Sequence, residues 1–168
     1  MVQNIRRFNI DGEWFQYGRK QGILFAEKEK LLAPEISLGG NFVYDQNGGF
    51  YSTTTVYGYV KKNNVKESYK CLMAILNSKL FWWYLVNTGT VLANGYFRYK
   101  PNYIKPFPIP SIIPAKSIER LENLVDQIIR IKQESISIKL ANIENNIDKI
   151  VYELYDLSQD EIDLIEKC

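Results

Sequence analysis

The chain has 168 residues, of which 46% are hydrophobic and 24% charged, a composition typical of folded globular proteins and not of disordered ones. It contains no histidine, which excludes imidazole general bases, serine–histidine nucleophile systems and histidine-ligated zinc. Its two cysteines, Cys71 and Cys168, lie far apart, so we expect neither a disulfide framework nor a cysteine zinc site.

Short strands are predicted in the first part of the chain. Runs of β-prone residues separated by turn signals occur at 22–26, 41–45, 50–54 and 56–60. The glycine-rich turn at 46–49 favours a hairpin whose arms are residues 43–45 and 50–51. A last strand is expected at 96–99.

Two short helices are predicted before that last strand. Residues 67–76 show helical periodicity, and Ser78 is placed to cap a second helix that ends at Gly89. We expect Trp82 and Trp83 of the second helix to lie in the core.

The last part of the chain has the periodicity of paired helices. Apolar residues recur at spacings of three and four over 118–128 and again over 136–154. The phase slips around 133–137, which favours a turn and two antiparallel helices packed as a hairpin; one long bent helix is the alternative. Ser158 and Glu161 match a capping box, so a short terminal helix is expected.

Charge divides the chain at a proline-rich stretch, residues 105–114. Residues 1–110 carry 14 Lys or Arg against 7 Asp or Glu, whereas residues 111–168 carry 7 against 12. Proline restricts the backbone and donates no hydrogen bond, so this stretch is expected to be extended. We therefore predict an α+β fold: a basic α+β domain over 1–110, the head, and a helical hairpin with a short terminal helix over 111–168.

No membrane segment is expected. The N-terminal residues form no continuous apolar stretch, and the most apolar run, 72–86, is interrupted by Asn77, Ser78 and Lys79. That run is also shorter than the roughly 20 residues that a membrane-spanning helix needs. A cytoplasmic protein is predicted.

Several catalytic motifs are missing from the sequence. There is no glycine-rich loop between a strand and a helix, no Asn- or Asp-Pro-Pro-aromatic motif, and no Gly-Lys-Ser or Gly-Lys-Thr. No carboxylate precedes a lysine by two positions, as it does in the commonest metal-dependent nucleases. We expect no catalytic residue, metal site or cofactor site in this chain.

Basic side chains beside aromatic and amide ones remain as candidate binding groups. They cluster at Arg6 and Arg7, Arg19 and Lys20, Lys28 and Lys30, Lys61, Lys62 and Lys66, and Arg98, Lys100 and Lys105. Such side chains supply phosphate contacts and donors to base edges. The predicted DNA-binding residues, on one side of the head, are Arg19, Lys20, Lys30, Arg98 and Lys100.

Arg98 is the predicted base reader, because a guanidinium can bond a guanine edge with two parallel hydrogen bonds. The alternative is that Arg98 pairs with Glu35 or Asp45 and only holds the last strand in place. For the stretch Lys-Lys-Asn-Asn at 61–64 the alternative is that it forms only the soluble tip of a hairpin.

A series of segments carries a family resemblance. In chain order they are Leu-Ala-Pro-Glu-Ile-Ser at 32–37, Phe-Val-Tyr-Asp at 42–45, Gly-Phe-Tyr at 49–51, Leu-Met-Ala-Ile-Leu-Asn-Ser-Lys-Leu at 72–80, Tyr-Phe-Arg-Tyr at 96–99, Phe-Pro-Ile-Pro at 107–110, and the stretch 147–162. Together they resemble the TaqI-like C-terminal specificity domain, found at the end of fused type II restriction enzyme–adenine methyltransferases. The resemblance extends roughly over 18–166.

The resemblance implies a non-catalytic target recognition domain that reads a short sequence of double-stranded DNA. It further implies an upstream methyltransferase domain of the same chain, which uses S-adenosylmethionine to methylate adenine at N6 and can be preceded by a nuclease. These 168 residues would then be a C-terminal fragment of a site-specific DNA-modifying enzyme. The base-reading residues of the family lie on variable loops without a motif, so none of them carries over by matching.

Two other hypotheses stay open. The chain resembles the recognition domain of a type I restriction specificity subunit less well, because such subunits usually carry two heads. A protein-interaction module that dimerises through the helical hairpin is the third, since the apolar seam over 136–154 could also pack against another chain.

Overall fold

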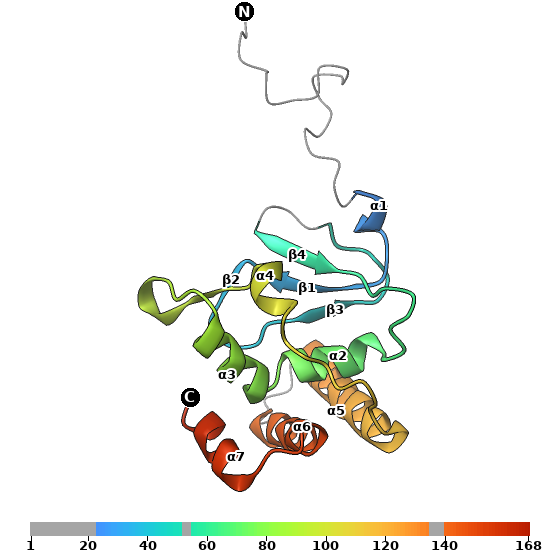
Figure 1. The fold of residues 1–168 in the computed structure, drawn as a ribbon. Coiled ribbons are helices and arrows are strands. Elements are labelled where there is room, and N and C mark those ends of the chain that lie inside the picture. Colours follow the sequence, from blue (N-terminus) through green and yellow to red (C-terminus); the bar gives the residue numbers. More distant parts are fainter. Residues whose placement is uncertain (1–22, 52–54, 135–139) are drawn as a thin grey trace, which may run out of the picture.

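A computed structural model describes residues 23–51, 55–134 and 140–168, and these form helices around small antiparallel sheets (Figure 1). The predicted α+β class is confirmed. The described part begins with a one-turn helix, α1 (Ile23–Ala26), so the strand predicted at 22–26 is wrong. Short apolar runs fit helix and strand alike, and Leu and Ala favour the helix.

A three-stranded antiparallel sheet forms one layer of the head. Its central strand is β1 (Lys30–Pro34), flanked by β3 (Val43–Asp45) and β4 (Val56–Tyr59). Leu31 and Ala33 are buried, as expected for alternate residues of a strand with one face on the core. Helix α2 (Tyr69–Leu76) lies against this sheet (Figure 1).

The hairpin predicted between 43–45 and 50–51 is wrong. Strand β3 pairs with β1, and residues 50–51 belong to no strand. The turn closes on a side chain instead: the carboxylate of Asp45 accepts hydrogen bonds from the backbone N–H groups of Gly49 and Phe50, each at 3.0 Å. These two donors are therefore turned toward Asp45 and not toward a neighbouring strand.

Helices α2 (Tyr69–Leu76) and α3 (Lys79–Thr88) confirm the predicted helix pair, including the cap at Ser78 and the end at Gly89. Asn77, the first of the two residues between them, joins the helices to the sheet. Its amide oxygen accepts from the N–H of Phe42 at 2.8 Å, and its amide nitrogen donates to the carbonyl of Phe42 at 2.9 Å. The amide of Asn77 thus satisfies both backbone groups of Phe42, as the backbone of a neighbouring strand would.

Aromatic rings fill the centre of the head. Phe81 is 0% exposed and lies within 6.5 Å, between ring centroids, of the rings of Phe42, Tyr84, Tyr99 and Phe107. Trp82 and Trp83 are only half-buried at the edge of this cluster. The side of α3 that carries Phe81 faces the core, which leaves the two tryptophans at its margin.

Helices α5 (Ala115–Gln133) and α6 (Ala141–Leu154) pair as the predicted helical hairpin, and α7 (Gln159–Glu166) follows. Because α5 ends at Gln133, the alternative of one long bent helix is wrong. The capping box is present: the hydroxyl of Ser158 accepts from the N–H of Glu161, whose carboxylate accepts from the N–H of Ser158 at 2.8 Å.

The hairpin is attached to the head by packing and by polar contacts. Helix α5 packs on α2, and the apolar core is continuous across both parts. The carboxylate of Asp148 on α6 accepts from the backbone N–H of Lys79 at 2.8 Å and so caps α3. The hydroxyl of Tyr155 donates to the carbonyl of Pro108 at 2.6 Å. The division into domains at 110/111 stays a prediction.

Candidate nucleic-acid interface

A two-stranded ribbon lies at the side of the head. It pairs β2 (Ile36–Ser37) with β5 (Phe97–Arg98), and Figure 1 shows the yellow-green segment after α3 extending away from the three-stranded sheet beside β2. Two residues in this segment, Asn94 and Gly95, have positive φ angles of 62° and 76°. The left-handed region suits Asn and Gly, so the sequence permits the tight turn that returns the chain to β5.

The ribbon and its connecting segment expose apolar side chains. The exposed fractions lie between 41% and 61% for Ile36, Leu38, Val91 and Tyr96. Each lies within a few residues of β2 or β5, and Val91 forms an isolated bridge with Phe97. These exposed apolar side chains make the ribbon a candidate interaction surface.

Arg98 lies on this ribbon and forms a half-exposed ion pair. Its Nη1 donates to Oε1 of Glu35 at 3.1 Å, with side-chain exposures of 35% and 24%. This is the contact that the structural alternative for Arg98 predicts. It engages one nitrogen of a guanidinium that has five N–H donors, so the pair is compatible with a second role toward base edges.

Lys100 follows Arg98 at the start of α4 (Pro101–Ile104), and Lys105 follows its end. A contact between Thr90 Oγ1 and the hydroxyl of Tyr103, at 2.6 Å, joins this short helix to the segment before the ribbon. Lys100 is half-buried and Lys105 is exposed, and neither forms an ion pair within the described residues. Arg98 and Lys100 are thus both partly accessible, and Lys105 is exposed five residues after Lys100 in the chain.

Lys30, another predicted binding residue, lies in the core. It is 2% exposed, and its ammonium donates to Oδ2 of Asp45 at 2.5 Å and to the carbonyls of Ala26 and Lys28 at 2.6 and 3.3 Å. All three ammonium hydrogens therefore have acceptors. Lys30 is buried because it begins the central strand, and it is not available to an outside partner. Arg19 and Lys20 lie outside the described residues.

The carboxylate of Asp45 is stabilised in its charged form. Burial acts to raise its pKa, but the hydrogen bonds from Lys30, Phe50 and Gly49 outweigh burial and lower the pKa below its ordinary value. Asp45 and Lys30 thus form a buried ion pair that fixes β1 to β3, unlike the half-exposed pair on the ribbon.

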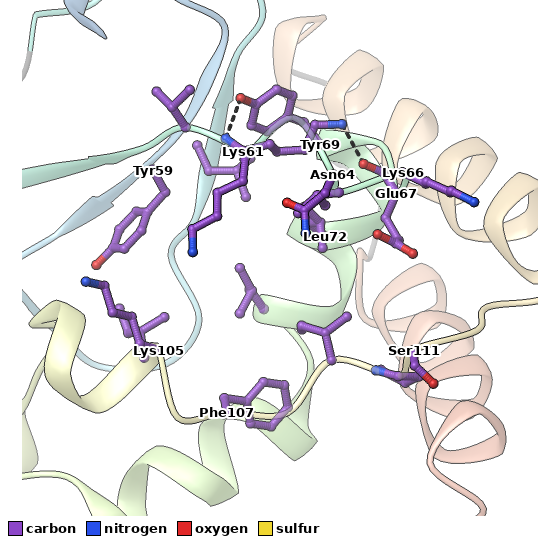
Figure 2. Close-up of a pocket in the computed structure, with 18 residues that line it drawn as sticks. Tyr59, Lys61, Asn64, Lys66, Glu67, Tyr69, Leu72, Lys105, Phe107 and Ser111 are labelled. Atoms are coloured by element: carbon purple, nitrogen blue, oxygen red, sulfur yellow. Dashed lines mark hydrogen bonds between the residues drawn. The ribbon is translucent and has the colours of Figure 1, made fainter.

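A groove opens on the head between the connection from β4 to α2 and the chain after α4 (Figure 2). Its volume is about 610 Å³, and its cationic lining residues are Lys61, Lys62, Lys66 and Lys105. We call it the lysine groove. The sequence places Lys105 about forty positions after Lys61 and groups it with Arg98, so only the fold reveals that it joins the earlier lysines.

Of the two cysteines, Cys71 is buried and Cys168 is exposed. Burial raises the pKa of the Cys71 thiol to about 11, so the thiolate is scarce near neutral pH. No group of three or more Asp, Glu or Cys residues in that part of the chain could hold a metal ion. Among the helices described, none is both long and apolar enough to cross a membrane.

Comparison with known proteins identifies the class to which this fold belongs. The profile of the TaqI-like C-terminal specificity domain matches residues 3–109, more than half of the chain, and the chain belongs to that family. The matched residues contain the three-stranded sheet, the ribbon and α2 to α4, and they end within the proline-rich stretch. The match is shorter than the resemblance expected over 18–166, because it stops before the helical hairpin.

Two longer bacterial proteins resemble the chain in sequence. The type II restriction enzyme and methyltransferase RM.Eco57I of Escherichia coli is 29% identical over 104 residues, which cover 60% of this chain and 10% of that protein. The type II methyltransferase M.BstVI of Geobacillus stearothermophilus is 26% identical over 166 residues, which cover 98% of this chain and 26% of that protein. The second alignment therefore includes the helical hairpin.

Proposed function

We propose that this chain is the target recognition part of a type II restriction–modification enzyme: it binds double-stranded DNA, reads a short sequence and performs no chemistry itself. The family match over residues 3–109 carries the proposal, because the matched part includes the ribbon and its cations. The basic head, with 14 Lys or Arg against 7 Asp or Glu in residues 1–110, supports a polyanionic partner.

The ribbon offers the side chains that reading a duplex requires. Arg98 would reach a guanine edge in the major groove, while Lys100 would contact a phosphate. The exposed apolar side chains of Val91 and Leu38 would meet thymine methyl groups, which lie in the same groove. A two-stranded ribbon is narrow enough to enter the major groove, which is about 12 Å wide. Arg19 and Lys20 remain proposed phosphate contacts.

The names and lengths of the two relatives support a proposal about the rest of the parent polypeptide. Both are methyltransferases by name, and the chain covers only 10% and 26% of their lengths. We propose that the parent polypeptide carries an upstream N6-adenine methyltransferase domain that binds S-adenosylmethionine. That domain would be the partner of this chain in the cytoplasm, and the helical hairpin would hold the head at a fixed angle to it.

Fluorescence polarisation with mixed-sequence duplexes tests the function. The 168-residue chain should bind with an affinity that falls steeply between about 50 and 200 mM salt. Lys100→Ala should weaken binding to all sequences and lower the slope of log K against log salt by about one unit. Arg130→Ala, at an exposed position of α5, is the matched control and should leave binding unchanged. Absence of salt-dependent binding by the wild-type chain would contradict the proposal.

A further inference from the structure

We propose that the lysine groove binds the phosphodiester backbone of one DNA strand, beside the ribbon that reads the bases. This inference rests on the proposed function and adds a second contact surface to it. The sequence groups the lysines involved into two separate clusters, and the fold brings these together in one groove.

The groove combines polar residues that are exposed to solvent with an inner surface that is mainly apolar. All of its exposed lining residues are polar: Lys62, Asn64, Lys66, Lys105 and Ser111. The large apolar residues at its floor, which include Tyr69, Ile104 and Phe107, are already buried by the protein itself. A partner therefore meets ammonium groups on the exposed residues and apolar surface inside the groove, which suits a ligand that carries anionic groups on an apolar framework.

The charges of the groove are unbalanced. Four lysines line it and only one carboxylate, that of Glu67. Lys61 is held in place, because its ammonium donates to the carbonyl of Glu67 at 2.6 Å and lies 4.9 Å from the centre of the Tyr69 ring. Lys62 and Lys105 form no ion pair within the described residues. Bringing like charges together is unfavourable, and a bound polyanion would offset that repulsion.

The walls of the groove favour a nucleic-acid strand over an isolated anion. Half-buried Leu72, Leu76 and Ile109 line it together with the lysine side chains, whose stems are apolar. A DNA strand alternates anionic phosphates with the apolar faces of its sugars, so it can use both kinds of contact. Figure 2 shows Lys105 on the same side of the groove as Tyr59, while Lys66 points away from its interior.

Helix α4 connects the groove to the ribbon. Lys100 precedes this one-turn helix and Lys105 follows it, so the two residues are about 7.5 Å apart along the helix axis at about 1.5 Å per residue. The phosphates of one DNA strand are spaced by about 3.4 Å along the duplex. One strand can therefore contact both lysines within a few nucleotides, and the groove continues the proposed interface.

Charge removal at the groove provides the test. The salt dependence of duplex binding by the 168-residue chain is measured for Lys62→Gln/Lys105→Gln and for the matched control Lys132→Gln/Lys149→Gln, whose lysines are exposed on α5 and α6. Each phosphate contact contributes about 0.9 to the slope of log K against log salt, so the groove variant should lose about 1.8. Its preference among duplex sequences should stay the same, and the control should keep the wild-type slope.

The outcomes separate the two proposals. If the wild-type chain shows no salt-dependent duplex binding, the proposed function fails and the inference fails with it. If the wild type binds but both double variants keep its slope, only the inference is overturned. If polyglutamate binds in a lysine-dependent way while duplex binding does not depend on Lys62 and Lys105, the groove takes an acidic polypeptide and the inference is again overturned. Equal melting temperatures of the variants establish that all of them are folded.

Discussion

The three-stranded sheet and the ribbon each contain a pair of opposite charges, yet the two pairs have different surroundings. Lys30 and Asp45 join β1 to β3 with side chains 3% exposed, whereas Arg98 and Glu35 join β5 to the residue before β2 with side chains 35% and 24% exposed. The sheet lies against α2, and the ribbon lies at the side of the head (Figure 1). A charge pair in the core holds the fold, and a similar pair at the edge remains accessible to a partner.

The largest expected effect is on the buried pair. Lys30→Met leaves the carboxylate of Asp45 buried without its cation, and breaking a buried pair in this way costs about 3–5 kcal/mol of unfolding free energy. Urea denaturation measures this loss. A loss below about 1 kcal/mol would contradict the description of the pair as buried and would restore Lys30 as a candidate surface cation.

A substitution in the turn after β3 should also destabilise the sheet region. Gly48 has a φ of +65°, and a Cβ added there would lie 2.2 Å from the carbonyl oxygen of Glu27. Gly48→Ala should therefore cost more than the roughly 1–2 kcal/mol of the backbone conformation alone. Gly95→Ala on the ribbon segment is the control, with a φ of +76° and no atom within 4 Å of the added Cβ. Equal losses of unfolding free energy at the two positions would show that the contact with Glu27 is absent.

Acid should weaken the sheet region through Asp45. Its pKa is lower in the folded protein than the ordinary value of 3.8, so its ionised form stabilises the fold above that pH. This contribution to stability is lost as the pH falls from 3.8, the ordinary pKa, through the lowered pKa of Asp45 in the folded protein. The difference in unfolding free energy between the wild type and Asp45→Asn should shrink over that range. A difference that does not change with pH would contradict the lowered pKa, and the comparison cancels the contribution of Asp148, whose pKa burial raises.

The smallest expected effect on stability is at the ribbon. Arg98→Ala removes a half-exposed pair and should cost no more than about 1 kcal/mol of unfolding free energy. The same variant should lose about 1–3 kcal/mol of discrimination at one base position, measured by selection from a randomised duplex pool. A larger stability loss with unchanged base preference would favour the alternative, in which Arg98 only holds β5 in place.

The contrast between the two regions also explains which features could be predicted from the sequence. Local signals are sufficient for α3 and α7: Ser78, Gly89, and the pair Ser158 and Glu161 each act on backbone groups within a few residues. The apolar seam likewise predicts α5 and α6, because its period is a property of each helix.

Features that depend on distant residues were not predictable in this way. The pairing of β1 with β3 replaces the predicted hairpin because a carboxylate takes up the turn donors. Lys30 ends a run of alternating charges, residues 27–30, which is typical of an exposed surface. The sequence therefore does not reveal that Lys30 begins the central strand and is buried. Lys105 reaches the groove only after α4 turns the chain. The pair of Arg98 with Glu35 is one of the two alternatives that the sequence leaves open.

Hydrogen–deuterium exchange with and without duplex DNA tests whether one side of the head forms the interface. We expect slower exchange on DNA binding in the ribbon and its connecting segment, residues 90–98, and in the groove segments 60–66 and 100–107. Exchange in α6 and α7 should stay unchanged. Slower exchange confined to α5, α6 and α7, with none in the ribbon or the groove, would contradict the account.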